Sequence, residues 1–362
     1  MFRLPVYTVP DFGAARFADA PEAAAQPAPA DGQLPDHFYA TTIYPEYFKV
    51  GGEWKLISDP RMDCAVVLTD GRPAAVEPRR VKAGEAVVVG RADDASRGVF
   101  VDYNAFSAPE EASQPFAFRT GRSRESSYSS DYDQLYDVLR HDREDGYIVW
   151  VLGPAVDFDY DARAALAKLI RGGFAHAVFG GNALGTHDLE AALYHTGLGQ
   201  DIYTKQIVPG GHYNHLQTIN LVRRAGSIPE FIQHNGIEDG ILAACVRKNV
   251  PFVLAGSIRD DGPLPGVIAD VYASQDAMRA HARKATTVIS LATQLHSIAT
   301  GNMTPSWQLR GGRIRPVYFY NVDISEFAVN KLRDRGSLSV HSIVTNIQDF
   351  LVHTARNLLP AG

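Results

Sequence analysis

The sequence has few cysteines, no long apolar run and no excess of positive charge. Its two cysteines, Cys64 and Cys245, lie far apart and form neither a disulfide framework nor a zinc-binding pattern, so we expect a reduced, cytoplasmic protein. No stretch approaches the roughly 18 apolar residues of a membrane-spanning helix. The start of the chain lacks a basic segment, an apolar core and a cleavage site, so we expect neither a secretory signal nor a membrane partner.

The charge balance is mildly acidic. There are 35 Lys and Arg residues against 41 Asp and Glu, which gives a net charge of −6. Nucleic-acid-binding domains usually carry a basic patch or stripe, and here the basic clusters, such as 119–124, are short and interrupted. We therefore expect no nucleic-acid partner. The length of 362 residues, with 45% apolar and 21% charged residues, suits a globular protein of two domains.

Composition divides the chain into three parts. Residues 1–33 contain an Ala- and Pro-rich stretch after a short apolar segment, which predicts an N-terminal arm and linker. Residues 34–131 alternate short apolar runs with Gly, Pro and Asp turns, which predicts a small β-rich domain. The end of this part, 119–131, is polar and Ser-rich and is predicted to be a loop or linker. Residues 132–362 are predicted to form the third part, a larger domain.

In the larger domain, apolar strands alternate with amphipathic helices. The pattern predicts six strands, at 148–152, 175–179, 251–255, 287–291, 317–322 and 340–345. Helices are predicted at 161–171, 188–195, 215–224, 238–248, 274–284, 294–300, 325–334 and 347–357. This order predicts an α/β fold with a Rossmann-like parallel sheet covered on both faces. Ligands of such sheets bind at the carboxyl ends of the strands, so the residues after each strand are the candidates for a site.

Two of the predicted strands run into loops that suit a nucleotide or a polar substrate. The second strand is followed by a Gly-Gly turn and then Asn182 and Ala183, where backbone amides can approach a pyrophosphate; a plain helix-entry turn explains it equally well. The third strand is followed by Arg259, Asp260 and Asp261, which can bind ribose hydroxyls or an amine, although a solvated turn also tolerates them.

Other polar residues also follow strands. The fifth strand ends at Asp323 and the sixth at Asn346; an acid in this position holds the ribose of NAD and disfavours the phosphate of NADP. His296, after the fourth strand, is also compatible with a core histidine. The pair His212 and His215 has metal-ligand spacing but no third ligand, so we expect hydrogen bonding to substrate rather than a metal site.

Five segments resemble the NAD-dependent ornithine cyclodeaminases of archaea, a family that includes LOR/SDH conserved-domain proteins. They are GGNALGTHDLE, GGHYNHLQTINLVRRAGSI, VPFVLAGSIRDDGPLPGVIADVYASQDAMR, LATQLHSIATGNM and VDISEFAVNKLRDRGSLSVHSIVTNI. The same unit forms the C-terminal part of cyanobacterial bifunctional arginine dihydrolase/ornithine cyclodeaminases. The resemblance covers residues 34–104 and 145–353. It implies a deoxyhypusine-synthase-like Rossmann domain and NAD as the cofactor.

The resemblance also implies an activity and an assembly. Ornithine is expected to become proline and ammonia, through a hydride passed to NAD and returned. We expect a homodimer or homotetramer, since related folds place the cofactor near subunit contacts and the apolar segment 1–12 cannot form a core alone.

The resemblance assigns roles to individual positions. It places cofactor contacts at Asn182, Ala183, Asp261, Thr293, Gln294, Leu295, His296, Asp323, Asn346 and Ile347. The candidates for the catalytic base and for substrate anchoring are His187, Asp188, His212, His215, Arg259 and Asp260. Among these, Arg259 is the candidate partner of a substrate carboxylate, because its guanidinium matches a carboxylate at two points.

The sequence also departs from the family pattern. Asp157-Phe158-Asp159 stands where the family has His-Thr-Gly, Tyr213 where it has Arg, and Asn346 where it has Asp. These changes leave the dinucleotide site plausible and leave the substrate open. The alternatives to ornithine cyclodeamination are a related cyclodeaminase or dehydrogenase acting on another amino acid, such as lysine, and a non-catalytic NAD-sensing protein.

Overall fold

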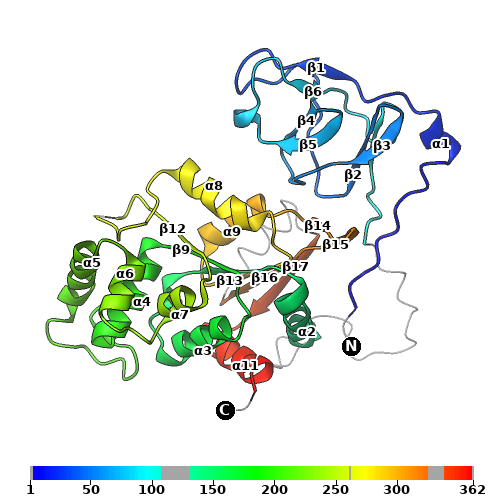
Figure 1. The fold of residues 1–362 in the computed structure, drawn as a ribbon. Coiled ribbons are helices and arrows are strands. Elements are labelled where there is room, and N and C mark those ends of the chain that lie inside the picture. The colour runs from blue at the N-terminus through cyan, green and yellow to red at the C-terminus, as the bar shows by residue number, and fades with distance from the viewer. Residues whose placement is uncertain (1–2, 107–129, 261, 325–337, 361–362) are drawn as a thin grey trace, which may run out of the picture.

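The computed structural model describes residues 3–106, 130–260, 262–324 and 338–360. Figure 1 shows a small β-rich region, drawn in blue, beside a larger α/β domain that follows it in the chain. Both parts of the predicted fold class are confirmed. The helix predicted at 325–334 and most of the loop predicted at 119–131 lie outside the described residues.

A six-stranded sheet forms the centre of the α/β domain. Its strands are all parallel and follow the order β12-β9-β8-β13-β16-β17. Their bounds are β8 Ile148–Leu152, β9 Ala177–Gly181, β12 Phe252–Ala255, β13 Thr287–Leu291, β16 Tyr318–Asp323 and β17 Ser339–Val344. All six predicted strands are present. The chain moves outward from β8 to β12, then returns beside β8 as β13 and moves outward the other way. The strand order therefore reverses between β8 and β13.

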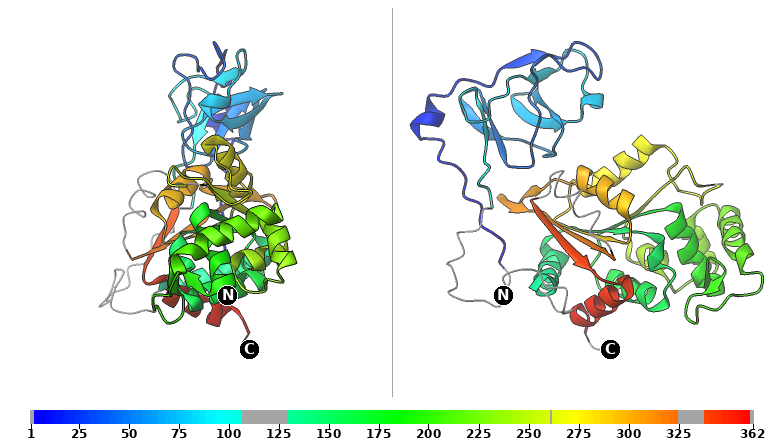
Figure 2. Two further views of the ribbon diagram at one scale, coloured as in Figure 1. Left: turned by 90° about the vertical axis from the view of Figure 1, so that its left-hand side faces the viewer. Right: turned by 180° about the vertical axis from the view of Figure 1, so that it is seen from behind.

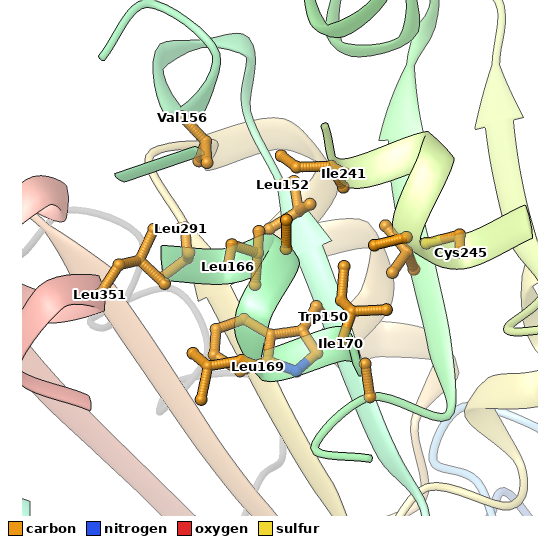
Figure 3. Packing of buried hydrophobic residues seen from close by; sticks show 14 of the residues in the cluster. Trp150, Leu152, Val156, Leu166, Leu169, Ile170, Ile241, Cys245, Leu291 and Leu351 are labelled. Carbon is orange, nitrogen blue, oxygen red and sulfur yellow. The ribbon is translucent and has the colours of Figure 1, made fainter. Parts of the chain in front are cut away.

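The two central strands explain the apolar runs of the sequence. Every residue of β8 and β13 is buried, because helices cover both faces of the sheet. The indole of Trp150 lies in the core and its Nε1 donates to the carbonyl of Phe174 at 2.7 Å. Figure 3 shows Leu169 and Ile170 of helix α3 (Tyr160–Arg171) beside Trp150, and Cys245 of helix α7 (Ile241–Lys248) in the same apolar cluster.

Helices pack in two layers. Side chains of α2, α3, α7 and α11 form one core with the sheet, and those of α8 and α9 form a second core on its other face. The helices are α2 Ser130–Asp145, α3 Tyr160–Arg171, α4 Asn182–Tyr194, α5 Asn214–Ala225, α6 Ile228–His234, α7 Ile241–Lys248, α8 Val271–Ala282, α9 Gln294–Met303 and α11 Ile347–Leu358. Two short hairpins complete the domain: β10 Thr196–Gly197 with β11 Gln200–Asp201, and β14 Trp307–Arg310 with β15 Arg313–Pro316.

Helix α4 differs from its prediction. We expected a glycine loop up to 187 and a helix from Asp188, but the helix begins at Asn182. The reason lies in packing: a Cβ added to Gly185 would come within 2.8 Å of the Leu254 side chain, so the glycine permits a close approach of α4 to β12. Gly185 therefore lies inside the helix rather than in a loop.

The small region contains two antiparallel sheets. Their strand orders are β1-β6-β4-β5 and β3-β2-β7. The bounds are β1 Ala25–Pro27, β2 Glu46–Val50, β3 Glu53–Leu56, β4 Ala65–Thr69, β5 Arg72–Val76, β6 Ala86–Val88 and β7 Val99–Val101. The prediction of a small β-rich unit ahead of the Rossmann-like domain is correct.

The N-terminal segment is not the linker that its composition predicts. Strand β1 pairs with β6, and the short helix α1 (Ala15–Ala18) buries Phe17 against the small region. The ammonium of Lys49 binds the end of this helix, donating to the carbonyls of Ala18 at 2.8 Å and Ala20 at 2.6 Å. The described part of 1–33 is therefore built into the β-rich region. A few aromatic anchors, hidden in an Ala- and Pro-rich sequence, account for the difference.

The two parts of the chain share a border on the side of α8, α9 and the β14–β15 hairpin (Figures 1 and 2). Trp307 and Ile314 of the hairpin belong to the apolar core of the small region. Glu77 of the small region forms ion pairs with Arg61 at 2.6 Å and with Arg279 of α8 at 2.8 Å. The hairpin was not predicted, although its Gly311-Gly312 turn is a recognisable sequence signal.

Candidate active site

Two neighbouring cavities lie at the carboxyl edge of the parallel sheet, one on each side of the reversal in strand order. The first, which we call the β9 cavity, has a volume of about 470 Å³ and is lined by residues that follow β8, β9, β12 and β13. The second, the β16 cavity, has a volume of about 550 Å³ and is lined by residues that follow β8, β13, β16 and β17. A Rossmann sheet binds its dinucleotide across this reversal. The paired cavities thus lie where such a cofactor is expected.

Eight of the ten predicted cofactor positions line these cavities. The β9 cavity contains Asn182, Ala183, Thr293 and His296. The β16 cavity contains Gln294, Asp323, Asn346 and Ile347. Leu295 lines neither cavity and is 76% exposed on α9, whereas Asp261 lies outside the described residues. The fold therefore brings together most of the predicted cofactor residues, which follow the ends of the strands.

Two helices, α4 and α9, begin at the β9 cavity without a capping hydrogen bond from the side chain of their own N-cap residues, Gly181 and Thr293. By contrast, Asp159 caps α3 and Asp270 caps α8. The first-turn amides of a helix need an acceptor and favour negative charge. Two uncapped helix starts beside one cavity fit the phosphate groups of a dinucleotide.

The residue packing also leaves room for a ligand next to Gly181. A Cβ added there would meet only the Cε1 of His296, at 3.5 Å, and the carbonyl of Ala255, at 3.7 Å. Burial lowers the pKa of His296, so its ring is neutral near pH 7. The side chain of Asn182 accepts a hydrogen bond from the amide of Leu264 at 3.0 Å, which fixes the loop after β12 against α4.

Four of the six catalytic candidates line the β9 cavity: His187, His215, Arg259 and Asp260. The rings of His187 and His215 have centroids 6.3 Å apart. Asp260 accepts from the amide of Ser257 at 2.8 Å and so shapes its own loop. The guanidinium of Arg259 has no hydrogen bond or ion pair to the described residues, which leaves it available to a carboxylate.

The other two catalytic candidates lie elsewhere. The His212 side chain is exposed, outside both cavities, and its ring lies against that of Tyr213 with centroids 4.1 Å apart. Asp188 is only 1% exposed and does not line either cavity. Its place in the structure is described next.

Asp188 has a structural role. Its Oδ1 accepts from Nε of Arg163 at 2.7 Å and from the amide of Ile241 at 2.9 Å, and its Oδ2 accepts from the amide of Leu242 at 2.7 Å. It therefore caps α7 and neutralises a buried arginine. The prediction of Asp188 as a catalytic base is not supported by this geometry, because both oxygens are already bound inside the core.

Glu190, which was not predicted from the sequence, supports the site. Glu190 is fully buried on α4, and its Oε2 lies 2.7 Å from Nδ1 of His187. Its Oε1 accepts from the hydroxyl of Thr196 at 2.8 Å. The three-residue spacing of His187 and Glu190 places both on one helix face and is a signal available in the sequence.

Asp157, at the start of the region that departs from the family pattern, is a second unexpected group. It is fully buried, and neither of its carboxyl oxygens has a hydrogen-bond partner among the described residues. Burial, followed by the nearby charge of Asp188, raises the pKa of the Asp157 carboxyl well above its ordinary value. Burial at this position therefore favours the protonated, uncharged form of the carboxyl group.

In the described part of the chain, no helix has the length and apolar character needed to cross a membrane. Across residues 3–106, 130–260, 262–324 and 338–360, no group of three or more His, Cys, Asp and Glu side chains forms a candidate metal site.

The sequence matches two family models. One describes the Rossmann fold in the C-terminal part of ArgZ-like arginine dihydrolases and covers residues 134–354. The other describes the first region of the same C-terminal part and covers residues 45–129. The chain belongs to this family.

Named relatives support this assignment. The ornithine cyclodeaminase of Methanopyrus kandleri is 42% identical over 336 residues, which cover 92% of this chain and 77% of that protein. The bifunctional arginine dihydrolase/ornithine cyclodeaminase AgrE of Nostoc sp. is 36% identical over 92% of this chain and 46% of its own length. The predicted resemblance is therefore confirmed.

Solved structures agree with the fold. A LOR/SDH protein from Methanococcus maripaludis is 37% identical, with a TM-score of 0.83 over 93% of this chain and 98% of that one. A ternary complex of AgrE with ornithine and NAD⁺ is 34% identical, with a TM-score of 0.57 over 94% of this chain and 46% of that one. These structures support the prediction of a NAD-binding Rossmann-like domain.

Proposed function

We propose that this chain is a NAD-dependent ornithine cyclodeaminase, which converts L-ornithine to L-proline and ammonia. One observation carries the proposal: the β9 and β16 cavities flank the reversal in strand order, and the β9 cavity also contains two histidines and Arg259, whose guanidinium has no ion pair with the described residues. The AgrE complex with ornithine and NAD⁺ supports it, because that protein shares this fold and 34% of its residues over the matched region.

The polar residues suggest how NAD lies across the two cavities. Asp323 ends β16 and lines the β16 cavity, where its carboxylate suits ribose hydroxyls. The β9 cavity instead contains residues able to bind an amino acid and to move a proton. We therefore place the adenosine half in the β16 cavity and the nicotinamide with substrate in the β9 cavity. In many Rossmann domains, the acid that binds the ribose follows the strand that corresponds to β9. Here β9 ends in Gly180-Gly181, so this strand supplies no acid at that position.

When bound, NAD⁺ supplies a hydride acceptor for the amine-bearing carbon and later a hydride donor, so that no net oxidation results. The protein must hold the substrate, accept a proton and exclude water. Arg259 pairs with the substrate carboxylate in a charge-assisted interaction. A histidine of the β9 cavity accepts a proton from the substrate ammonium, because only the neutral amine can attack as a nucleophile.

The balance of ammonia and NADH tests this reaction. The purified protein is incubated with ornithine and less than one equivalent of NAD⁺, while ammonia, proline and NADH absorbance are followed. We expect ammonia and proline in large excess over NAD⁺, with little accumulated NADH. Ammonia that stops at the amount of NAD⁺, with an equal amount of NADH, would establish an amino-acid dehydrogenase instead.

A second candidate is a cyclodeaminase or dehydrogenase for another amino acid, such as lysine. The observation that favours it is the Asp157-Phe158-Asp159 segment, which replaces residues usual in the family. Phe158 of this segment packs edge-on against the ring of His187, which lines the β9 cavity. A panel of diamino acids analysed by mass spectrometry separates the two. Binding of NAD without ammonia release from any member of the panel would support the non-catalytic, NAD-sensing alternative.

A further inference from the structure

We propose that Glu190 is a positioning residue that holds His187 in the protonation pattern needed for proton transfer in the β9 cavity. The inference rests on the proposed function, since it names the histidine that accepts the substrate proton. Three observations carry it: the contact between the two side chains, the burial of Glu190, and a hydrogen-bonded support behind it.

The contact defines which ring nitrogen of His187 is free. Nδ1 lies 2.7 Å from Oε2 of Glu190, and His187 lines the β9 cavity. A carboxylate accepts hydrogen bonds, so Nδ1 carries the hydrogen and donates it. Nε2 is then the basic nitrogen, and it is the one left for a molecule in the cavity. A carboxylate behind a histidine serves in this way in catalytic triads and metal sites, where it sets the tautomer and ring orientation.

Burial makes the arrangement specific. Glu190 has no exposed surface and His187 is 7% exposed, so bulk water does not compete for their hydrogen bond. The second oxygen of Glu190 accepts from the Thr196 hydroxyl at 2.8 Å. That hydroxyl in turn accepts from Nδ2 of Asn214 at 2.8 Å. Each donor in this series of hydrogen bonds has one acceptor, so the bond from Thr196 fixes the rotamer of Glu190 on the side away from His187.

The support also joins the two histidines of the cavity. Thr196 lies in β10 and Asn214 begins α5, directly before His215. The series of hydrogen bonds from His187 to Asn214 therefore connects α4, β10 and the start of α5. These hydrogen bonds tie both ends of the segment 196–214 to the proton-accepting side of the cavity.

Other charged or titratable groups surround His187. His215 of α5 faces its ring at 6.3 Å, and Arg259 and Asp260 line the same cavity from the loop after β12. Asp188 is engaged with Arg163, and the ring of Phe158 packs edge-on at 5.1 Å. Of the described residues, Glu190 is the one whose carboxylate contacts the His187 ring, and this makes it the determinant of the tautomer.

The tautomer is measured directly in the wild-type holoprotein. The ¹⁵N chemical shifts of the His187 ring, assigned by comparison with His187→Asn, distinguish a protonated Nδ1 from a protonated Nε2. We expect hydrogen on Nδ1. Hydrogen on Nε2 would overturn the proposal, whatever the enzyme's substrate proves to be.

The variant Glu190→Gln tests the catalytic consequence. It keeps the shape of the side chain but removes the charge that favours hydrogen on Nδ1, so kcat should fall at least about tenfold. KM for ornithine and the affinity for NAD should stay within about twofold, because neither contact is changed. Glu238→Gln, at an exposed position outside both cavities, is the matched control and should retain wild-type rates.

The outcomes separate this inference from the proposed function. An unchanged kcat in a folded Glu190→Gln protein would overturn the positioning role, and so would a loss confined to KM. If Glu190→Gln does not fold, Thr196→Val, which removes the donor to Oε1, replaces it; the same fall in kcat is expected, to a smaller extent, and no fall would count against the proposal. Absence of ammonia from ornithine in the wild type would instead remove the proposed function, while the ¹⁵N measurement would still decide the tautomer.

Discussion

Single residues of the α/β domain differ in what burial does to them. Both carboxylate oxygens of Asp188 accept hydrogen bonds in the core, whereas buried Asp157 has no hydrogen-bond partner within the described part of the chain. Burying a carboxylate without a partner costs much more free energy than protonating it. The first residue therefore stabilises the fold as an anion and the second is tolerated as an acid. Two aspartates of the same domain thus make opposite contributions to the free energy of unfolding when they are ionised.

Asp157→Asn should stabilise the protein at neutral pH. The folded-state pKa of Asp157 lies above its unfolded value of about 4. The unfolded state therefore loses its proton first, and stability falls as the pH rises from about 4 toward the folded-state pKa. An amide imitates the protonated acid and removes this loss. Urea unfolding at pH 5 and pH 8 should show a smaller pH dependence in the variant, with the larger gain at pH 8. A variant less stable than the wild type at pH 8 would contradict the argument.

Asp323→Ala should weaken NAD binding by about 1–3 kcal/mol, because a hydrogen bond to a charged group is lost. The carboxylate also repels the extra phosphate of NADP, so the wild type should prefer NAD. Calorimetric titration of both cofactors against both proteins measures the two effects. Equal or tighter NADP binding by the wild type would reject the ribose assignment of Asp323.

Elements show where sequence patterns were sufficient. The six parallel strands were predictable because burial on both faces requires continuous apolar runs such as Ile148–Leu152. The start of α4 was not, because Gly185 is needed for close packing against Leu254, a contact between segments distant in sequence. The short helix α6 and the β14–β15 hairpin were also missed. Both have a local signal, which is the Ser227–Glu230 capping box for α6 and the Gly311-Gly312 turn for the hairpin. The place of the hairpin in the fold, however, depends on tertiary contacts such as that of Trp307 with the small region.

The candidate site divides in the same way. Residues such as Asn182, Asp323 and Asn346 follow strands directly, so the sheet topology alone brings them to one edge. Glu190 and Thr196 do not follow a strand of the parallel sheet, so the strand ends did not point to them. Their roles depend on side-chain hydrogen bonds, which link them to each other and to His187 and Asn214. Asp188 and His187 were both candidates, but successive helix positions face different directions, and the carboxylate of Asp188 points into the core instead.

The link between α3, α4 and α7 depends on Asp188. Asp188→Ala would leave Arg163 with Asp239 as its remaining ion-pair partner among the described residues, and it would leave two buried amides of α7 without acceptors. It should therefore destabilise the domain by about 2–5 kcal/mol. Thermal unfolding measures the loss. Enzyme that remains folded at low temperature should keep most of its kcat, because Asp188 does not line the cavity. A large loss of kcat at full folding would restore the catalytic interpretation.

At the scale of the whole molecule, the α/β domain contributes side chains to the core of the small region. The β14–β15 hairpin leaves the α/β domain and enters the core of the small region, and the ion pair of Glu77 with Arg279 joins them again. The N-terminal segment, expected as a free arm, packs on its own chain: the hydroxyl of Tyr7 donates to Asp102 at 2.9 Å, and Phe12 stacks on Trp54. A reason for assembly must therefore be found elsewhere than in this segment.

The last prediction is a homodimer or homotetramer held by the segment 198–216, beside the β9 cavity. This segment exposes large apolar side chains, among them Leu198 at 63%, Tyr203 at 72% and Ile207 at 82%. Apolar groups concentrated at an exposed surface mark contacts with other molecules, because their removal from water is favourable. Light scattering at micromolar concentration should give the oligomer for the wild type. Ile207→Glu should dissociate it, since a buried, unpaired charge is costly, whereas Val6→Glu, in the N-terminal segment, should leave it intact. A monomeric wild type would contradict the prediction, and dissociation by Val6→Glu alone would move the interface to the N-terminal segment.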